Sequence, residues 1–299
     1  MGRLTAIVLG SAAGGAFPQC NCRCPVCALA WAGDSRVQPR TQTGIAVSAG
    51  DGRWTLINAS PDLPSQIRAT PALHPRGALR GSPVDGVVLT GAEIDQIAGL
   101  LSLRESSPFT LYATPASHAA VAANAMFGAM GAMSRRAINP GERFMLAGDI
   151  EATLFMVPGK LPLYLEGEAP ELDIESAANV GIELHREGAR MVFVPGTAAV
   201  TPAMRERFAR ADVVLFDGTL FTDDEMIRTR TGQKTGRRMG HLQIDGDGGS
   251  LRALAGLSAR RIFVHINNTN PILIEGSVER RTVEGAGWQV AEDGMEIVL

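Results

Sequence analysis

The chain has 299 residues, 45% of them hydrophobic and 20% charged, a composition typical of a globular protein with a large core. Its 28 Lys and Arg residues are scattered among 31 Asp and Glu residues, for a net charge of -3, so we expect no nucleic-acid partner. No stretch offers about 18 apolar residues free of charge and proline, so we expect a cytoplasmic protein with no membrane span and no membrane partner.

Short apolar runs rich in Val, Ile and Leu, bounded by Gly, Pro, Asn or Asp, predict buried strands along the whole chain. The predicted strands are Leu4–Leu9, Gly44–Val47, Trp54–Asn58, Gly86–Leu89, Phe109–Ala113, Ala152–Val157, Gly181–Leu184, Met191–Val194, Val213–Phe216, Arg261–His265 and Met295–Val298. Segments of helical character alternate with them, and the Ala-rich one begins with a proline, which favours a first helical turn. The predicted helices are Asp95–Arg104, Pro115–Met133, Pro202–Ala209, Gly249–Ala259 and Val278–Gly285.

These strands are more numerous than a simple alternating βαβ protein needs. The pattern therefore predicts an α/β protein in which two sheets pack together with helices outside. The polar, proline-containing segment Gly159–Asn179 is predicted to be a long loop between strands. Because no repeat and no Ser/Gly linker divides the chain, we predict a single domain over residues 1–299.

All four cysteines fall between Cys20 and Cys27. A disulfide framework spreads its cysteines through the fold, whereas such clustering in a reducing compartment favours a metal. The spacing C-x-C-x-x-C puts Cys22, Cys24 and Cys27 on one turn, and thiolates are strong ligands for tetrahedral zinc. We predict a structural zinc knuckle at residues 22–27, with a fourth ligand from elsewhere and Cys20 outside it. The alternative is three cysteines that are simply buried.

Polar side chains follow three of the predicted strands. Asp95 comes shortly after the strand that ends at Leu89, Asp217 follows another strand, and His265 ends a third. If these strands are neighbours, the three side chains converge and predict a divalent metal site of carboxylates and imidazole. Taken alone, Asp95 is typical of a helix cap and His265 of a structural histidine.

His241 lies in a Gly-containing stretch ahead of a predicted helix. It is a candidate general acid or metal ligand, and the alternative is a solvated loop histidine. The remaining histidines, His74, His118 and His185, lie in no cluster and receive no role. The glycines of residues 10–15 have the wrong spacing for a dinucleotide-binding turn, so no nucleotide cofactor is predicted.

Several motifs occur together in one order along the chain. They include Asn58-Ala-Ser-Pro-Asp62, Asp217-Gly-Thr219, Lys234-Thr-Gly236, Met239-Gly-His241 and His265-Ile-Asn-Asn-Thr-Asn-Pro271. With the cysteine motif, they make the chain resemble the coenzyme PQQ synthesis protein B family of the metallo-β-lactamase superfamily nearly end to end. The resemblance implies the αββα sandwich of that superfamily, with two mixed sheets packed together and helices outside.

The resemblance also implies where a metal binds. Superfamily hydrolases carry T-H-x-H-x-D-H at this turn, and here Gly91, Glu93, Asp95 and Gln96 occupy the four ligand positions after Thr90. Because only the aspartate is kept, a dinuclear zinc hydrolase mechanism is not expected.

What the resemblance implies instead is a looser site for a divalent metal, expected to be Fe(II). Its ligands would be Asp95, Asp217 and His265, with Gln96 or water filling in. Related phosphodiesterases have a zinc-binding histidine where this chain has Asn268, so the fourth knuckle ligand is Asn268, His241 or a water.

The family is tied to biosynthesis of pyrroloquinoline quinone (PQQ) from a Glu–Tyr unit. The resemblance implies hydroxylation of the tyrosine ring by an iron-dependent oxygenase, with Asp95, His241 and His265 as catalytic residues. The alternative, which Gln96 favours, is a non-catalytic carrier or binder of PQQ or its precursor, involved in its transport. The partners implied are a small-molecule or dipeptide PQQ precursor, other proteins of the pathway, and a second copy of the chain in a homodimer.

Overall fold

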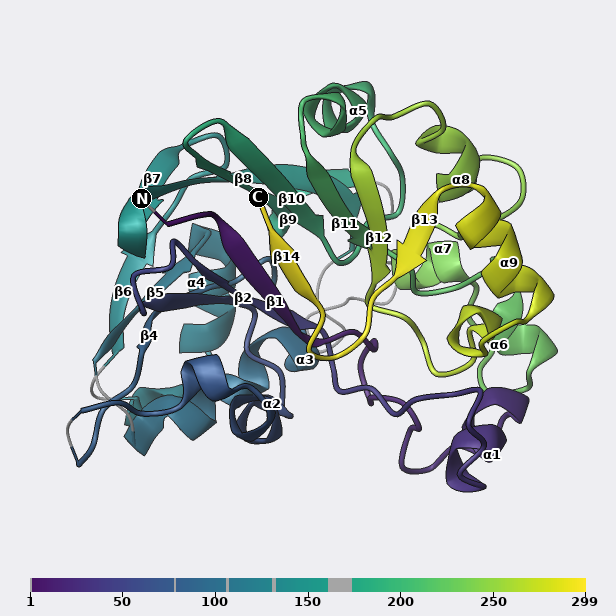
Figure 1. The fold of residues 1–299 in the computed structure, drawn as a ribbon, viewed down its shortest axis with the longest axis horizontal. Helices are drawn as coiled ribbons and strands as arrows, with labels where there is room; N and C mark the ends of the chain where they lie inside the picture. The colour runs from purple at the N-terminus through teal and green to yellow at the C-terminus, as the bar shows by residue number, and fades with distance from the viewer. Residues whose placement is uncertain (1, 78, 106–107, 131–132, 161–173) are drawn as a thin grey trace.

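The computed structural model describes residues 2–77, 79–105, 108–130, 133–160 and 174–299. Two mixed seven-stranded sheets form the centre of the molecule (Figure 1). The first sheet has the order β14-β1-β2-β3-β4-β5-β6. Its strands are β1 (Thr5–Gly10), β2 (Gly44–Ser48), β3 (Trp54–Ile57), β4 (Val84–Val88), β5 (Phe109–Ala113), β6 (Met133–Ala137) and β14 (Glu296–Val298).

The second sheet has the order β13-β12-β11-β10-β9-β8-β7. Its strands are β7 (Arg143–Leu146), β8 (Ile150–Gly159), β9 (Ile174–Arg186), β10 (Ala189–Val194), β11 (Val213–Asp217), β12 (Arg260–Val264) and β13 (Trp288–Val290). Strands β10 to β13 are parallel, and β7 to β10 are antiparallel to one another. Because parallel strands share an edge for their carboxyl ends, the loops after β11 and β12 leave the sheet side by side.

Helices cover the outer faces of both sheets. The α-helices are α1 (Pro25–Trp31), α2 (Leu63–Ala69), α3 (Ile94–Ile97), α4 (Pro115–Ala122), α5 (Pro202–Ala209), α6 (Glu225–Arg228), α7 (Gly236–Met239), α8 (Ser250–Ala253) and α9 (Val278–Gly285). The 3-10 helices are η1 (Pro71–Leu73), η2 (Ala98–Glu105), η3 (Ala125–Ala129), η4 (Ala147–Asp149) and η6 (Pro271–Leu273). In the described part of the chain, none of them has the length and hydropathy of a membrane span.

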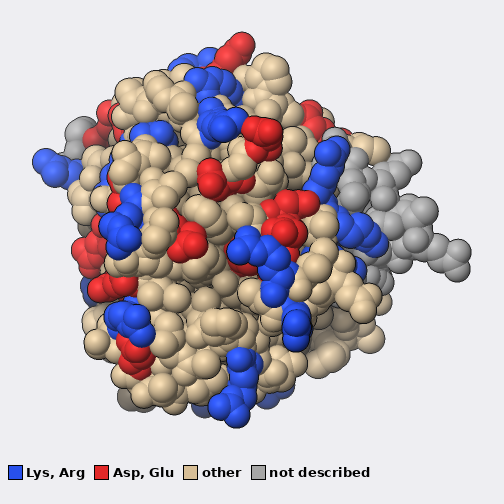
Figure 2. Space-filling view, turned by 90° about the vertical axis from the view of Figure 1, so that its right-hand side faces the viewer, with Lys and Arg blue, Asp and Glu red and all other residues tan. Residues whose placement is uncertain are grey.

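Three apolar layers hold these elements together. Ile57 and Phe193 belong to the layer between the sheets, Leu63 to the layer under α2, and Phe208 and Trp288 to the layer under α5 and α9. Helices outside and two sheets inside make the predicted αββα sandwich, which the structure confirms. On the face shown in Figure 2, Lys and Arg lie interspersed with Asp and Glu.

Each predicted strand overlaps an observed one, but three strands escaped prediction. These are β6, β7 and β13, which are short, and β6 carries the exposed sequence Ser-Arg-Arg. An edge strand with polar side chains lacks the apolar run that the prediction relied on. The structure confirms helices Pro202–Ala209 and Val278–Gly285 at their predicted bounds.

Three predicted segments need correction. The helix expected over Pro115–Met133 ends at Ala122, and Met133 already belongs to β6. The helix over Gly249–Ala259 is a single turn, α8. In the predicted loop Gly159–Asn179, residue 159 belongs to β8 and residues 174–179 to β9, while residues 161–173 lie outside the described residues.

Candidate metal centre and substrate pocket

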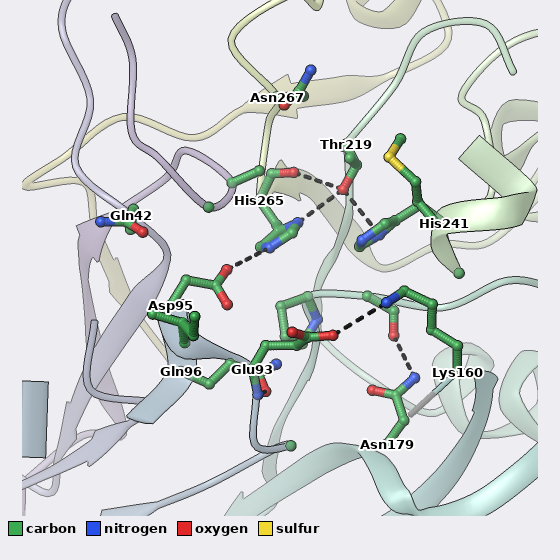
Figure 3. A pocket seen from close by; sticks show the side chains of 18 of the residues that line it. Gln42, Glu93, Asp95, Gln96, Lys160, Asn179, Thr219, His241, His265 and Asn267 are labelled. Atoms are coloured by element: carbon green, nitrogen blue, oxygen red, sulfur yellow. Dashed lines mark hydrogen bonds and ion pairs between the residues drawn. The ribbon is translucent and has the colours of Figure 1, made fainter. Parts of the chain in front are cut away.

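A pocket of about 490 Å³ opens where loops from both sheets meet (Figure 3). The turn after β4 contributes Asp95, the loops after β11 and β12 contribute Thr219 and His265, and the segment after α7 contributes His241. Asp217, the last residue of β11, lies directly behind this wall and is fully buried. The strands whose polar ends were predicted to converge therefore do meet at one site.

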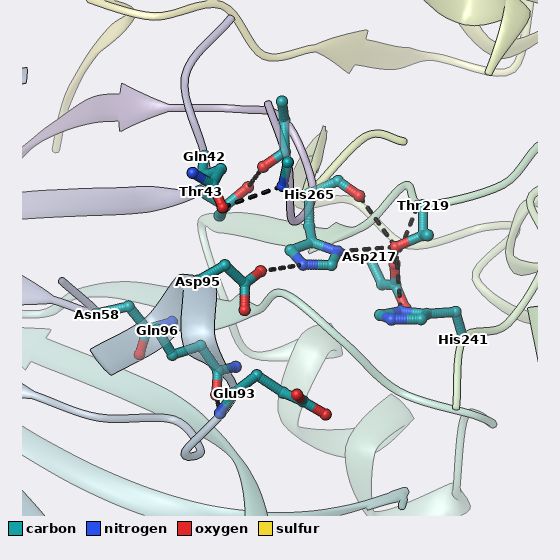
Figure 4. Close-up of polar contacts among 12 residues, drawn as sticks. Gln42, Thr43, Asn58, Glu93, Asp95, Gln96, Asp217, Thr219, His241 and His265 are labelled. Atoms are coloured by element: carbon teal, nitrogen blue, oxygen red, sulfur yellow. Dashed lines mark hydrogen bonds and ion pairs between the residues drawn. The ribbon is translucent and has the colours of Figure 1, made fainter. Parts of the chain in front are cut away.

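Asp217, His241 and His265 form a compact group, in which one ligand atom from each lies within 4.8 Å of the others (Figure 4). His241 Nδ1 lies 2.8 Å from Asp217 Oδ2. The two imidazole rings stack with their centroids 5.1 Å apart and their planes at 20°. Two imidazoles and a carboxylate at this spacing are a donor set that suits a divalent transition metal, so the residues fit the expected ion.

Thr219 links all three members of this group and was not singled out from the sequence. Its Oγ1 lies 2.6 Å from Asp217 Oδ1, 2.8 Å from His265 Nδ1 and 3.0 Å from His241 Nδ1. The hydroxyl donates to the carboxylate and accepts from an imidazole, so it fixes the orientation of both rings. The Asp-Gly-Thr sequence directly after a buried strand is the signal that could have identified it.

Asp95 lies on the opposite side of the His265 ring. His265 Nε2 donates to Asp95 Oδ2 over 3.0 Å. Burial alone would raise the pKa of Asp95 and lower that of His265, but the hydrogen bond and the opposite charges outweigh it. The pKa of Asp95 therefore lies below its ordinary value and that of His265 above. The helix cap considered for Asp95 is Glu93 instead.

Gln96 does not join the group. Its Oε1 accepts a hydrogen bond from the backbone N–H of Glu93 over 3.0 Å, the contact of a capping box at the start of α3. A Cβ on Gly91 would lie only 2.5 Å from that oxygen. The Gln96 amide thus occupies the space beside Gly91 and stabilises the turn through the helix cap.

Glu93 is also engaged, because Lys160 Nζ lies 3.4 Å from its Oε1. Neither Gly91 nor Glu93 therefore offers a free ligand for a second ion beside the first. Among the described residues, Asp217, His241 and His265 offer a donor set for one metal at this pocket.

The cysteine knuckle forms a second compact group away from the pocket. One sulfur from each of Cys22, Cys24 and Cys27 lies within 4.8 Å of the others. The Asn268 side chain faces them, with Nδ2 3.1 Å from Cys22 Sγ and 3.3 Å from Cys27 Sγ. Turning this amide by 180° about its last bond presents its oxygen at the same place. His241, the other residue considered for the knuckle, lies with Asp217 in the pocket.

The thiols fit a zinc ion on chemical grounds. Burial raises the pKa of Cys24 to about 12 and also raises the pKa of Cys27, so these thiols need a bound cation to ionise. Three sulfurs and the amide oxygen of Asn268 would supply the four ligands of a tetrahedral site. Cys20 is exposed and does not join the cluster.

Comparison with known proteins agrees with this geometry. Residues 53–266 match the model of the beta-lactamase superfamily domain. "Coenzyme PQQ synthesis protein B" of Methylobacterium nodulans is 53% identical over 99% of this chain and 100% of its own length. The crystal structure of Zn²⁺-bound PqqB from Methylobacterium extorquens has 52% identity and a TM-score of 0.97, and covers 99% of this chain and 100% of that one.

A diphosphatase of the PhnP family shares the fold alone. It is 20% identical with a TM-score of 0.69, covering 99% of this chain and 97% of its own. The full-length likeness to the first two proteins, together with the superfamily match, shows that the chain belongs to the coenzyme PQQ synthesis protein B family of the metallo-β-lactamase superfamily.

Proposed function

We propose that this chain acts in PQQ biosynthesis by hydroxylating the tyrosine ring of a Glu–Tyr-derived intermediate with the help of a ferrous ion. The observation that carries the proposal is the donor set of His241, His265 and Asp217 on the wall of the pocket. Two histidines and one carboxylate with open positions are the ligand pattern of non-haem iron oxygenases. Membership of the family supports the pathway.

Each polar residue at the pocket has a separate role in the proposed reaction. Asp217, His241 and His265 would hold the ion, Asp95 orients the His265 ring through its hydrogen bond, and Thr219 fixes both rings. A bound ferrous ion would supply the redox chemistry with dioxygen. One oxygen atom enters the ring, the other leaves as water, and an external reductant supplies two electrons along with two protons from solvent. A structural zinc at the knuckle is a separate part of the proposal.

The pocket suits an aromatic substrate. Its volume of about 490 Å³ lies in the range of sites for small molecules. Ile94, which is 63% exposed, and Met239 line it and offer apolar contact to a ring.

The test is a single-turnover reaction. Protein purified without chelators is loaded with ferrous iron under nitrogen and then exposed to oxygen, ascorbate and the dipeptide Glu–Tyr. Mass spectrometry should find the dipeptide heavier by one oxygen atom. A protein that binds no iron and yields no heavier product contradicts the proposal.

Two variants make the test specific. Asp217→Asn removes the carboxylate charge from the metal group and should abolish both iron binding and product. His185→Ala changes a histidine in β9, outside the residues that line the pocket, and should leave both unchanged.

A second candidate is a non-catalytic carrier of PQQ or its precursor. The observation in its favour is the engagement of Gln96 in a helix cap, which leaves fewer ligands than superfamily hydrolases have. Calorimetric titration separates the two functions, because a carrier binds PQQ tightly without metal and forms no hydroxylated product.

A further inference from the structure

Two lysines are among the residues that line the pocket. Lys160 follows the end of β8, and Lys234 lies in the loop before α7. Among the described lining residues, these are the only Lys or Arg side chains. Strands and loops far apart in the chain thus bring two ammonium groups to one pocket.

The Lys160 side chain is 13% exposed, and its Nζ lies 3.4 Å from Glu93 Oε1 (Figure 3). Space for its stem comes from Gly240, where an added Cβ would lie 3.1 Å from Lys160 Cγ. Gly240 has a φ of 83° and ends α7 directly before His241. The same turn therefore precedes His241 and leaves room for the stem of Lys160.

The two lysines differ in their surroundings. Lys160 contacts Glu93. Lys234 is exposed and makes no ion pair with another described residue. Lys234 can therefore bind an anionic group that enters the pocket, and Glu93 holds Lys160 in position.

We propose that Lys160 and Lys234 bind carboxylates of the substrate, and so select an aromatic acid whose ring lies against Asp217, His241 and His265. This inference rests on the proposed function, because it assumes that the Glu–Tyr-derived substrate occupies this pocket. The ligand class is an aromatic polycarboxylate. The lysines bind its carboxylates, and its ring lies next to the metal group. Lysine suits this task because its ammonium group donates hydrogen bonds to carboxylates in several orientations.

The effect is large enough to measure. A hydrogen bond to a charged group in a partly buried site changes affinity by about 10- to 100-fold. Replacing a carboxylate of the ligand by an amide, or a lysine of the protein by methionine, should each cost about that factor. Combining both changes should lower the binding affinity little more than either change alone, because each removes the same contact.

The experiment is calorimetric titration of the full chain as purified, with its metals, under nitrogen so that no turnover occurs. The ligands are Glu–Tyr, its C-terminal amide and Gln–Tyr, which differ by one carboxylate each. The wild-type protein should bind Glu–Tyr about 10- to 100-fold more tightly than at least one of the two neutralised ligands. Lys160→Met and Lys234→Met should each remove part of that preference, whereas Arg143→Met, at the β7 edge, should keep it whole.

A wild-type protein that binds the three ligands equally overturns the inference, and so do lysine variants that keep the full preference. Neither result depends on turnover. If the preference is present and the lysine variants lose it while no hydroxylated product ever forms, the carboxylate site stands and the proposed hydroxylation fails. If product forms without any preference, the proposed function stands and the carboxylate site fails.

Discussion

Replacing Asn270 by alanine removes the side chain that joins the two loops beneath the metal group. Asn270 is fully buried, its Nδ2 donates to the carbonyl of Gly218 over 2.9 Å, and its Oδ1 accepts from the backbone N–H of Ile272 over 3.1 Å. A weaker contact reaches the carbonyl of Thr219, which keeps a second partner in the N–H of Asn267. The substitution therefore orphans one carbonyl and one N–H.

Each buried polar group left without a partner costs about 1 to 3 kcal/mol. Two such groups predict that Asn270→Ala lowers the free energy of unfolding by about 4 kcal/mol. Urea unfolding followed by circular dichroism measures this loss. The same variant should also weaken iron binding, because the loop that carries Thr219 loses its anchor.

The matched control is Gln289→Ala, which removes an exposed amide that contacts Arg260 over 2.8 Å. Such a surface change should stay within about 0.5 kcal/mol of the wild-type stability. A loss below about 1 kcal/mol in Asn270→Ala would refute the reasoning, because it would mean that water or a shifted loop satisfies both orphaned groups.

Three further outcomes are expected. Burial raises the pKa of Glu225 from 4.5 to about 7, so the folded state holds this proton more tightly and stability falls as pH rises from about 4.5 through 7. In Glu225→Gln, urea unfolding over that range should show a fall smaller by about 3 kcal/mol; equal slopes would contradict this. Elemental analysis should find one zinc fewer per chain in Cys24→Ser and no loss in Cys20→Ser. Trp288→Ala, which removes a ring stacked on Phe263 at 4.0 Å, should cost about 4 kcal/mol in urea unfolding, and a loss under about 1 kcal/mol would exclude the stack as a major contact.

The sequence predicted the two central sheets because most buried strands consist of short apolar runs that can be recognised in the sequence. It also predicted that Asp95, Asp217 and His265 would converge if their strands were neighbours. This holds for β11 and β12, whose carboxyl ends share an edge, whereas β4, which precedes Asp95, lies in the other sheet. It failed at β6, whose exposed Ser-Arg-Arg pairs with β5 through the backbone and leaves no apolar pattern.

The sequence also could not predict the direction in which individual side chains point. Gln96 lies at a ligand position in the sequence, but its amide turns back to the backbone of Glu93, and only the geometry of the α3 turn decides this. Thr219 and Lys160 were missed because their residue types alone do not mark them as site residues. Threonine and lysine are common in loops, and their importance arises only when two distant segments bring them to one pocket.

The segment from His265 to Asn270 contributes to both candidate metal groups, although no cysteine is among the described residues that line the pocket. His265, with a φ of 56°, is held at one end by Thr219, and Asn268 faces the thiols three residues later. Three residues span at most about 10 Å of chain, so Asn268 cannot shift far without moving His265. An ion bound at the knuckle therefore fixes the position of an imidazole in the pocket.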